Sequence, residues 1–406
     1  MPSRRTIAEH ASAESVIVVS PAAAPRVERG HPWVYREAVK SGGRGLAVGE
    51  VVQVRGPDGQ PLGQGLWDPR SPIAVRMYCR ELLPRLDENV MADLLARAFA
   101  LRDVWFSSGN TTAFRLCNGE GDGIAGLVVD RYGSVAVVKT DGDAMAAWVA
   151  RIAERMWLAL RDRGVTSLVQ RVAAAAAGKD RNRALFGAPA PDCVEVVENG
   201  IAMVVDIAHG QKTGAFLDQR DNRKMVRSLA AGRRVLNLYS YAGGFSTAAA
   251  LGGASHVTSV DVAQAAHCAA QRSMRLNGID PDGHAFVTAD VPSFLEHARR
   301  QSKQWDLVIS DPPSFAPNEK ARLRALAAYR KLHAACAAVL SLKGVLCASS
   351  CSSHVTADEF AQTLDGAALG GKGARLVGLF GQPCDHPTVP AWPEGRYLKF
   401  AVLVRA

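Results

Sequence analysis

Two short stretches of the sequence contain residue types that could carry out covalent chemistry on a heterocyclic base. Residues 349–352 read Ser-Ser-Cys-Ser, so the thiol of Cys351 lies among hydroxyl groups where a buried strand is expected to end. Residues 311–315 read Asp-Pro-Pro-Ser-Phe and follow another expected strand. A thiolate is a strong nucleophile, and a carboxyl such as that of Asp311 can stabilise charge that develops on an attacked ring. The two stretches therefore indicate a site in which sulfur attacks a ring.

Cytosine is the base for which this pair of groups is most useful. Its C5 is a poor nucleophile, and addition of a thiolate to C6 creates an enamine whose C5 can attack an electrophilic methyl group. Pro312, Pro313 and Phe315 would hold a base that has been turned out of its stack. Two alternatives stand beside this reading, since prolines also end strands and a cysteine on a buried strand is usually inert core, as we expect for Cys347. No residue of the sequence stands out as the base that removes the C5 proton.

A glycine-bearing turn and an acidic residue indicate a nucleotide-containing cofactor. In residues 239–245 the two glycines let the backbone approach a ligand, and the start of the following helix favours negative groups. Asp261 ends the next expected strand, where a carboxylate can accept both hydroxyls of an adenosine ribose. NAD and S-adenosylmethionine fit these features equally, and the Asp-Pro-Pro stretch favours S-adenosylmethionine. For Asn277 and Asp290 a helix cap and a loop carboxylate are the alternative roles. The residues predicted to contact the cofactor are Tyr239, Gly243, Gly244, Phe245, Asp261, Asn277, Asp290 and Asp311.

Alternating strands and helices must position these residues. Reactive groups at the ends of parallel strands lie at the edge where open α/β sheets bind ligands. We therefore predict an α/β fold with a mostly parallel seven-stranded sheet wrapped by helices and an antiparallel edge. The expected strands are 234–239, 256–261, 284–289, 305–310, 344–350, 374–380 and 396–404, and the expected helices lie near 245–251, 263–277, 292–300 and 320–340.

The first half of the chain lacks this regular alternation. Apolar runs at 16–19, 50–54 and 73–77, separated by turn formers, predict a small β-rich unit, and residues 84–192 mix two helices with several strands. Residues 1–14 are expected to be frayed, and the alanine run 173–177 to lie in a mobile loop.

Two groups of side chains in this half have alternative readings. Trp33 and Tyr35 stand beside basic residues and could stack on bases, and burial in a small core is the alternative. Glu120, Asp122 and Asp130 lack the full pattern of a calcium-binding loop, so we expect them to be solvated turn carboxylates.

Composition narrows the class of protein. The 406 residues have a net charge of +9 and a pI near 9.3, which favours a polyanionic partner. Eight cysteines occur without a Cys-x-x-Cys pair, which argues against a zinc or iron–sulfur site and favours reduced thiols in the cytosol. The sequence has no run of about 18 apolar residues and no apolar signal core. We predict a cytoplasmic protein that binds neither metal nor membrane.

Motifs along essentially the whole chain belong together. They are residues 30–35 (Gly-His-Pro-Trp-Val-Tyr), 209–214 (His-Gly-Gln-Lys-Thr-Gly), 216–220 (Phe-Leu-Asp-Gln-Arg), 241–245, 311–315, 350–352, 385–387 (Asp-His-Pro) and 393–399 (Pro-Glu-Gly-Arg-Tyr-Leu-Lys). With these motifs the chain resembles the bacterial 23S ribosomal RNA (cytosine-C5)-methyltransferases that carry an N-terminal PUA domain. The Lys-Thr-Gly and Asp-Gln-Arg run and the Ser-Cys-Ser element are the specific parts of the resemblance.

The resemblance implies a division of the chain and roles for its residues. It implies an RNA-binding PUA domain at 1–82, a central α+β domain at 83–192 and a Rossmann-like class I methyltransferase domain at 193–406. It also implies ribosomal RNA as partner, Cys351 as the nucleophile that bonds to C6, and a place for Phe216, Gln219 and Arg220 beside the methionine end of S-adenosylmethionine. Other RNA cytosine methyltransferases have a second cysteine, which helps product release, where this chain has Ser314. Release must therefore work otherwise here.

Three other functions stay open at this point. Related enzymes that share the cofactor and Asp-Pro-Pro motifs but lack the cysteine methylate guanine. A non-catalytic RNA-binding ribosome-assembly factor with a vestigial cofactor site is the second alternative, and a small-molecule methyltransferase or NAD enzyme is the third. The modified nucleotide, free RNA or assembled subunit as substrate, and monomer or homodimer as the working form are also open.

Overall fold

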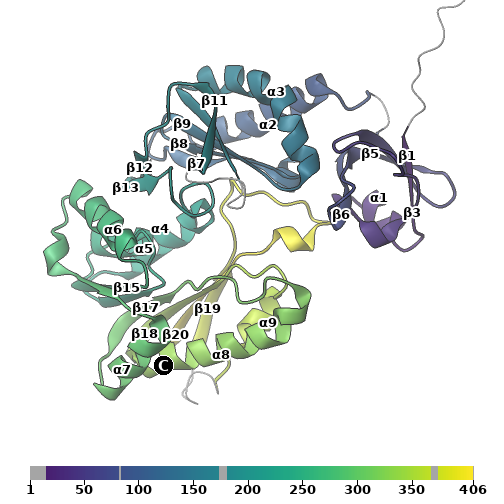
Figure 1. Ribbon diagram of the computed structural model, residues 1–406. Helices are drawn as coiled ribbons and strands as arrows, with labels where there is room; N and C mark the ends of the chain where they lie inside the picture. Colours follow the sequence, from purple (N-terminus) through teal and green to yellow (C-terminus); the bar gives the residue numbers. More distant parts are fainter. Residues whose placement is uncertain (1–14, 82–83, 173–180, 367–373, 406) are drawn as a thin grey trace, which may run out of the picture.

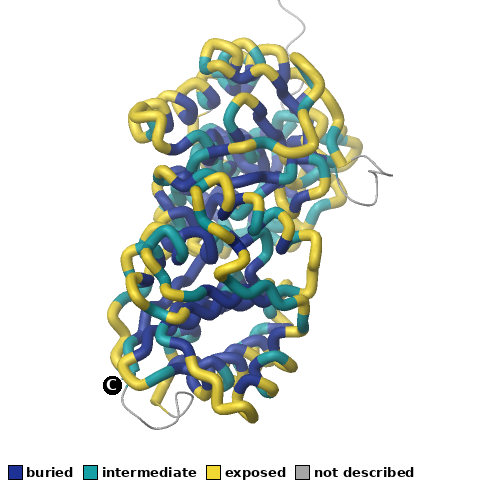
Figure 2. Tube along the Cα trace, turned by 90° about the vertical axis from the view of Figure 1, so that its left-hand side faces the viewer, coloured by how far each residue is buried: buried dark blue, intermediate teal, exposed yellow. Residues whose placement is uncertain are grey.

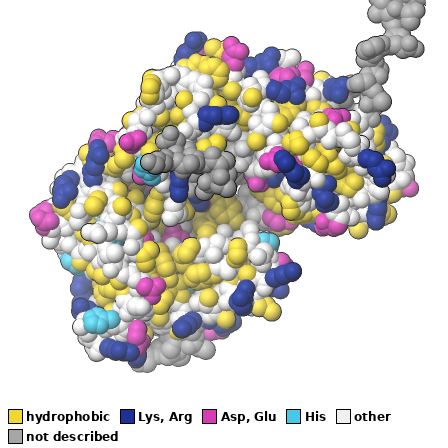
Figure 3. Space-filling model, in the orientation of Figure 1, with side chains coloured by type: hydrophobic (Ala, Val, Ile, Leu, Met, Phe, Trp, Pro, Cys, Tyr) yellow, Lys and Arg dark blue, Asp and Glu magenta, His cyan; other side chains and the backbone are white. Residues whose placement is uncertain are grey.

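The computed structural model describes residues 15–81, 84–172, 181–366 and 374–405. The predictions for residues 1–14 and 173–177 lie outside these residues. Within them, the strands form sheets of six, five and seven strands and one two-stranded hairpin. Figure 1 shows the three sheets in three separate bodies, with the six-stranded sheet nearest the N-terminus and the seven-stranded sheet in the C-terminal half. The molecular surface is hollowed between the body of the seven-stranded sheet and the bodies of the other two sheets (Figure 3).

Short strands build most of the six-stranded sheet, and in β1 and β4 buried residues alternate with half-buried ones. The order is β2-β6-β5-β4-β1-β3. Three of these strands were missed from the sequence because they are very short or contain glycines, namely β2, β3 and β5. The elements are β1 (Val16–Val19), α1 (Ala24–Glu28), β2 (Trp33–Tyr35), β3 (Val39–Ser41), β4 (Val51–Arg55), β5 (Pro61–Trp67) and β6 (Ile73–Cys79).

The five-stranded sheet has the order β11-β10-β9-β8-β7 and packs against two long helices. Its core includes Trp148 and Phe99, one from each helix, both almost completely buried. The elements are α2 (Glu88–Trp105), β7 (Ala113–Asn118), β8 (Leu127–Tyr132), β9 (Val135–Thr140), α3 (Asp143–Arg161), β10 (Ser167–Arg171) and β11 (Asn182–Gly187). The hairpin of β12 (Cys193–Glu198) and β13 (Ile201–Asp206) turns at Asn199 and Gly200, both with positive φ as a type I′ turn requires.

The seven-stranded sheet has the order β16-β15-β14-β17-β18-β20-β19, in which only β20 pairs antiparallel with its neighbours. This confirms the predicted α/β architecture with an antiparallel edge. Its strands are β14 (Arg234–Leu238), β15 (His256–Asp261), β16 (Ala285–Thr288), β17 (Trp305–Ser310), β18 (Leu340–Ser350), β19 (Ala374–Phe380) and β20 (Lys399–Arg405). Its helices are α4 (Arg220–Leu229), α5 (Gly244–Leu251), α6 (Gln264–Leu276), α7 (Val291–Arg300), α8 (Arg322–Ala338) and α9 (Ala357–Gln362).

Each face of this sheet has its own apolar core. Val235 and Leu307 point to the side of α4 and α5, whereas Leu236 and Val308 point to the side of α7 and α8. Figure 2 shows the sheet as the buried layer between more exposed helices. Strands buried on both faces need continuous apolar runs, which is why the sequence predicts them well. The strand predicted at 396–404 starts too early. Residues 393–395 form a short 3-10 turn, and β20 begins only at Lys399.

Candidate active site

Strands that lie side by side in the seven-stranded sheet end at the two predicted reactive residues. β17 pairs with β18 in parallel, and Ser310 lies opposite Ala348. Asp311 directly follows β17, and Cys351 directly follows β18. The register therefore brings both residues to the same edge of the sheet.

Cys351 and Cys347 differ in accessibility although they lie in one segment of the chain. Cys351 is a free, half-buried thiol, and Cys347 is completely buried in the core on the α4 side of the sheet. Burial raises the pKa of the Cys351 thiol, the Asp311 carboxylate raises it further, and the Lys212 ammonium lowers it. Burial raises the pKa of Cys347 to about 12. The expectation that Cys347 is inert core is confirmed.

A chain of hydroxyl groups holds the two reactive loops together. Ser350 Oγ donates to Tyr329 Oη at 2.9 Å, and Tyr329 Oη lies 2.9 Å from Ser352 Oγ. Ser352 Oγ also lies 3.1 Å from Ser314 Oγ in the Asp-Pro-Pro-Ser loop. Both chain neighbours of Cys351 are thus tied to one buried tyrosine of α8, which keeps the thiol on a fixed turn.

Gln219 fixes the Asp311 carboxylate. Its Nε2 donates to Asp311 Oδ1 and to Ser349 Oγ, both at 2.9 Å, and its Oε1 accepts from Asn222 at 2.6 Å. Burial raises the pKa of Asp311 to about 6. A carboxyl with such a pKa can hold and release a proton near neutral pH, as a general acid does.

Lys212, which the sequence placed in a motif without a role, borders the site. Its backbone has φ +52°, a left-handed conformation that is strained for lysine. Its Nζ lies 2.8 Å from Asp218 Oδ2 and 4.5 Å from the ring centre of Phe216. Tyr397 Oη donates to the same Asp218 oxygen at 2.7 Å. Burial alone would raise the pKa of Asp218, and Lys212 and Tyr397 instead keep that pKa below its ordinary value.

The turn after β14 has the strained backbone that close approach to a ligand requires. Tyr239, Tyr241 and Gly243 have φ of +59°, +45° and +73°. A Cβ on Gly243 would lie 2.3 Å from the Cβ of Ala270, so only glycine fits there. Asp261 accepts the Tyr241 N–H at 2.8 Å and a second backbone N–H at 2.9 Å. Its half-exposed carboxylate keeps lone pairs for two ribose hydroxyls, so these residues fit an adenosine-containing cofactor.

Phe216 joins the segment that precedes α4 to this turn. Its ring meets that of Tyr241 edge to face, with centroids 5.4 Å apart. Tyr241 Oη accepts the backbone N–H of Gln211 at 3.0 Å. Gly244 follows at the start of α5, where a Cβ would lie 2.9 Å from Cδ of Arg223. The structure thus brings Phe216, Gly243 and Gly244 together, as predicted for residues of one cofactor site.

Three other residues predicted to contact the cofactor have structural partners instead. The Asn277 amide donates to the carbonyl oxygens of Ala202 and Ser273 at 2.7 Å and accepts the Ala202 N–H at 3.0 Å. Phe245 is buried and stacks on Phe400, with centroids 5.9 Å apart. The prediction is corrected for both, because their polar or aromatic surface is already in use.

Arg220 is the third of these residues, whereas Asp290 has a structural partner and also an exposed carboxylate. Both Nη atoms of Arg220 donate to Asp385, at 2.7 and 2.8 Å, and the residue is 2% exposed. Asp290 is the N-cap of α7, where its Oδ2 accepts the backbone N–H of Ser293 at 3.2 Å. Asp290 is exposed on the loop after β16, so a further contact to a ligand remains a prediction for this residue alone.

The residues predicted to hold the base show mixed exposure. Pro312 is buried, Pro313 is exposed, and Phe315 is half-buried. The Phe315 ring packs on Tyr329, with centroids 4.8 Å apart, so that residue supports the hydroxyl chain as well. Their contact with a base remains a prediction.

Trp33 and Tyr35 have different surroundings. Trp33 Nε1 donates to Glu120 at 2.8 Å, and its ring lies 5.1 Å from that of Trp392. Trp33 is half-buried and joins its domain to two other parts of the chain, so burial in a small core is not its environment and its contact with a base remains a prediction. Tyr35 lines a surface cavity of about 210 Å³ together with Arg26 and Trp33, so it remains a candidate for a stacking contact.

A seam of buried charges joins the central domain to the seven-stranded domain. Asp385, which is 0% exposed, pairs with Arg220, accepts the backbone N–H of Arg115 at 2.9 Å, and lies 3.0 Å from Nδ1 of His386. The Arg115 side chain pairs with Asp130 at 2.8 and 3.0 Å. In Figure 1 the C-terminal segment carrying Asp385 leaves the seven-stranded sheet and runs along both other bodies.

The acidic residues of the central domain belong to this seam and its surroundings. Asp122 forms a two-point pair with Arg102 at 2.6 and 2.8 Å, and Arg102 also donates to the carbonyl oxygen of Asp385. Thr213 Oγ1 donates to Asp130 at 2.6 Å, which ties the Lys-Thr-Gly loop to the same network. The expectation that Glu120, Asp122 and Asp130 are solvated was wrong, because each meets a partner that is distant in the sequence.

The part of the chain that the structure describes contains neither a metal-binding cluster nor a membrane-spanning helix. No group of three or more His, Cys, Asp or Glu side chains could hold a metal ion in that part of the chain. None of the helices that the structure describes is long and apolar enough to cross a membrane.

Comparison with known proteins adds to this geometry. The model of a family of S-adenosylmethionine-dependent methyltransferases matches residues 163–392, and the model of a PUA-like domain matches residues 17–80. A protein from Deinococcus radiodurans named ribosomal RNA large subunit methyltransferase is 38% identical over 394 residues, which are 95% of this chain and 96% of that protein.

Two further similarities extend over nearly the whole chain. Ribosomal RNA large subunit methyltransferase I from Alteromonas mediterranea is 34% identical over 389 residues, which are 94% of this chain and 97% of that protein. A crystal structure of a methyltransferase complexed with SAH superposes with a TM-score of 0.84 at 27% identity, over 96% of this chain and 99% of that one.

Proposed function

The chain belongs to the S-adenosylmethionine-dependent methyltransferase family, and from this premise we propose that it methylates C5 of a cytosine in large-subunit ribosomal RNA. The names of its relatives from Deinococcus radiodurans and Alteromonas mediterranea support ribosomal RNA as the substrate class. The net charge of +9 favours a polyanionic partner. The reaction would take place in the cytoplasm.

The three parts of the chain divide the work in this proposal. Residues 1–82 bind RNA as a PUA-like domain, with Tyr35 beside its surface cavity. Residues 83–192 form a central domain that fixes the Lys-Thr-Gly loop through Asp130. Residues 193–406 bind the cofactor and carry out the chemistry.

S-adenosylmethionine, when bound, supplies an electrophilic sulfonium methyl group. The turn at Gly243 and Gly244 would hold it closely, and Asp261 would accept its ribose hydroxyls. Phe216 and Gln219 would flank its methionine end, as the resemblance implies. The strained φ of Tyr239 and Tyr241 supports this assignment, because such backbone persists where the surroundings enforce it.

Cys351 is the nucleophile of the proposed reaction. Its thiolate forms a bond to C6 of the cytosine, and the electron pair of the C5–C6 double bond makes C5 nucleophilic. Once C5 carries a methyl group, loss of the C5 proton lets the S–C6 bond break and restores the aromatic ring. The observation that carries the proposal is the half-exposed Cys351 thiol on a fixed turn beside Asp311.

Asp311 is the acid of the same step. Addition of sulfur to C6 places negative charge on the ring, which a proton or a hydrogen bond at N3 relieves. The pKa of about 6 means that a useful fraction of Asp311 is protonated near neutral pH. Gln219 holds the carboxyl in one orientation.

Covalent trapping tests this proposal. A large-subunit RNA fragment that contains 5-fluorocytosine should form an adduct with the wild type in the presence of S-adenosylmethionine, because fluorine cannot leave C5 as a proton does. Cys351→Ala should form none on a denaturing gel. Cys347→Ala is the matched control from the same segment, and it should trap the RNA as the wild type does.

Two outcomes would contradict the assignment. If the wild type transfers methyl groups to guanine and traps no 5-fluorocytosine RNA, the base is wrong. If Cys351→Ala still incorporates methyl groups into cytosine at the wild-type rate, the nucleophile is wrong.

A further inference from the structure

A buried lysine lies beside the reactive thiol. Lys399, the first residue of β20, is 2% exposed and pairs across the strands with Ser350. Its Nζ donates to the carbonyl oxygen of Ser352 at 2.5 Å and to that of Tyr397 at 2.8 Å. Both chain neighbours of Cys351 therefore contact Lys399: Ser350 pairs with its backbone, and the Ser352 carbonyl accepts from its amine.

The partners of this amine are unusual for a buried lysine. Both are neutral backbone carbonyls, which stabilise an ammonium less than a carboxylate does. Burial lowers the pKa of Lys399 to about 8, and the neighbouring Cys351 acts in the opposite direction. Lysine therefore exchanges its proton in a range where a thiol also does.

We propose that Lys399 is the proton partner of Cys351, so that its amine accepts the thiol proton and its ammonium then stabilises the thiolate. A neutral amine has two N–H groups and one lone pair. In neutral Lys399 the two carbonyls take the two N–H groups, and the lone pair stays free to accept a proton. The proposal deepens the cytosine chemistry above and rests on it, because a thiolate is what attack at C6 requires.

The step is a proton transfer with no change in oxidation state. The S–H bond of Cys351 breaks and an N–H bond forms on Nζ of Lys399. The electron pair stays on sulfur and later forms the S–C6 bond. When that bond breaks after methylation, sulfur leaves as a thiolate, and the ammonium is again its counterion.

Other charged and titratable groups face this pair and are part of its pH dependence. From each element packed around them, these are Asp311 after β17, Lys212 and Asp218 in the segment before α4, Tyr329 on α8, Glu359 on α9 and Tyr397 before β20. Asp311 and Asp218 disfavour the thiolate, while Lys212 favours it. Lys399 differs from Lys212 in being buried and bonded to the turn that carries the thiol.

The pH dependence of thiol alkylation tests the proposal on the free, full-length protein. Iodoacetamide reacts with the thiolate, and mass spectrometry of the tryptic peptide 344–372 reports Cys351 and Cys347 separately. Lys399→Gln retains two N–H donors and removes both the basic lone pair and the charge. At pH 7 its Cys351 should react roughly tenfold more slowly than in the wild type, with a profile moved upward by about one pH unit.

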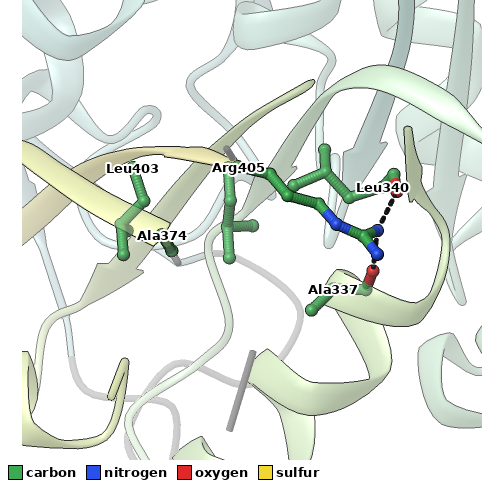
Figure 4. A pocket seen from close by; sticks show the side chains of 6 residues that line it. Ala337, Leu340, Ala374, Leu403 and Arg405 are labelled. Atoms are coloured by element: carbon green, nitrogen blue, oxygen red, sulfur yellow. Dashed lines mark hydrogen bonds between the residues drawn. The ribbon is translucent and has the colours of Figure 1, made fainter. Parts of the chain in front are cut away.

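Two further variants make the result specific. Lys399→Arg keeps a cation that stabilises the thiolate but has no lone pair to accept the thiol proton, so it should recover only part of the loss, with a Cys351 reaction rate at pH 7 between those of Lys399→Gln and the wild type. Arg405→Gln is the matched control on the same strand. The Arg405 Nη1 atom donates to the carbonyl oxygens of Ala337 and Leu340 (Figure 4). Arg405 is at the other end of β20 from Lys399, so removal of its guanidinium should leave the pH profile of Cys351 unchanged.

Cys347 reports whether each variant is folded. It stays unreactive in a folded protein because it is completely buried. If Cys347 becomes reactive in Lys399→Gln, the experiment uses Lys399→Met in place of that variant, and the expected result is the same upward shift of the Cys351 alkylation profile. An unchanged Cys351 profile in a folded variant, or an equal shift in Arg405→Gln, would overturn the proposal.

Trapping and alkylation separate this inference from the proposed function. If the wild type traps 5-fluorocytosine RNA and Lys399→Gln alkylates like the wild type, the role of Lys399 fails alone. If the wild type traps no RNA, the cytosine assignment fails, whatever the alkylation profile is.

Discussion

Two buried regions of this protein contain charged groups and differ in how those groups are paired. In the seam around Asp385, carboxylates meet guanidinium groups at 2.6 to 3.0 Å with nearly complete exclusion of solvent. Around Cys351 the carboxyl of Asp311 meets the amide of Gln219, and the amine of Lys399 meets two carbonyls. The first region pairs full opposite charges, whereas the direct partners of Asp311 and Lys399 in the second region are neutral dipoles.

This difference in pairing has opposite effects on proton binding. The pKa of Asp385 lies below its ordinary value, because His386 and Arg220 outweigh the effect of burial. The pKa of Asp311 is raised to about 6 and that of Lys399 is lowered to about 8, because burial dominates for both. Burial with an ion partner fixes a charge and joins domains, whereas burial with a neutral partner leaves a proton that can move.

The largest effect is expected in the seam. Asp385→Asn removes the buried counterion of the Arg220 guanidinium and leaves only the exposed Asp221 carboxylate at 3.5 Å, so it should lower the free energy of unfolding by about 3–5 kcal/mol. Urea denaturation followed by circular dichroism measures it. The matched control is Asp103→Asn, which breaks an exposed pair with Arg163 and should change stability by less than about 1 kcal/mol. Equal effects of the two variants would show that pairing in the seam contributes no more than a surface pair.

The same pair has a defined dependence on pH. Because the folded pKa of Asp385 is depressed, its contribution is present above the ordinary pKa of 3.8 and is lost as the pH falls through the folded value. The cost of Asp385→Asn should therefore be greatest near neutral pH and shrink in acid.

An effect on stability of intermediate size and opposite sign is expected for Asp311, beside Cys351. The pKa of Asp311 is raised from 3.8 to about 6, so its contribution to stability is full below pH 3.8 and lost as the pH rises through 6. Asp311→Asn should raise stability by about 1–2 kcal/mol at pH 7.5, and the gain should vanish near pH 4. Methyl transfer should fall roughly 100-fold.

Thermal unfolding at pH 7.5 and pH 4 checks this prediction. Gln219 can still donate to the amide oxygen of the variant, so the loss of charge is the main change. A loss of stability at pH 7.5 would mean that Asp311 is as well paired as the seam carboxylates, and the contrast between the regions would disappear.

The smallest effect is expected from a single hydroxyl. Tyr329→Phe removes the group that joins Ser350 to Ser352 and should lower stability by about 1 kcal/mol. It should also slow adduct formation with 5-fluorocytosine RNA by about tenfold, because the turn that carries Cys351 is then less fixed. Tyr78→Phe, which removes a buried hydroxyl bonded to Ala125 in the central domain, should cost similar stability and leave trapping unchanged.

Elements that depend on local pattern could be predicted from the sequence. Runs buried on both faces predicted the strands β14, β15, β17 and β18, and two glycines predicted the tight turn after β14. Cys351 and Asp311 could be placed at one edge of the sheet because each directly follows such a strand. Their chemistry depends on residue type and on position at a strand end, and both are visible in the sequence.

Contacts between distant residues could not be predicted in this way. Asp122 and Asp130 were predicted to be turn carboxylates because their partners Arg102 and Arg115 come close to them only when the strands and α2 pack together. Asn277 and Phe245 lie at the expected positions in the chain, but their side chains turn toward the hairpin and the core. Lys399 gave no signal of its own, since a lysine at the start of a strand is usually exposed.

The path of the chain after β19 has a consequence for biosynthesis. Asp385, Trp392 and Lys399 are translated after their partners in the earlier parts of the chain, including Arg115, Trp33 and Ser352. While the nascent chain leaves the exit tunnel of the large ribosomal subunit, its domains can form but remain unjoined. Cys351 is then still without Lys399, so in the proposed mechanism its thiolate is not yet stabilised while the nascent chain lies beside ribosomal RNA.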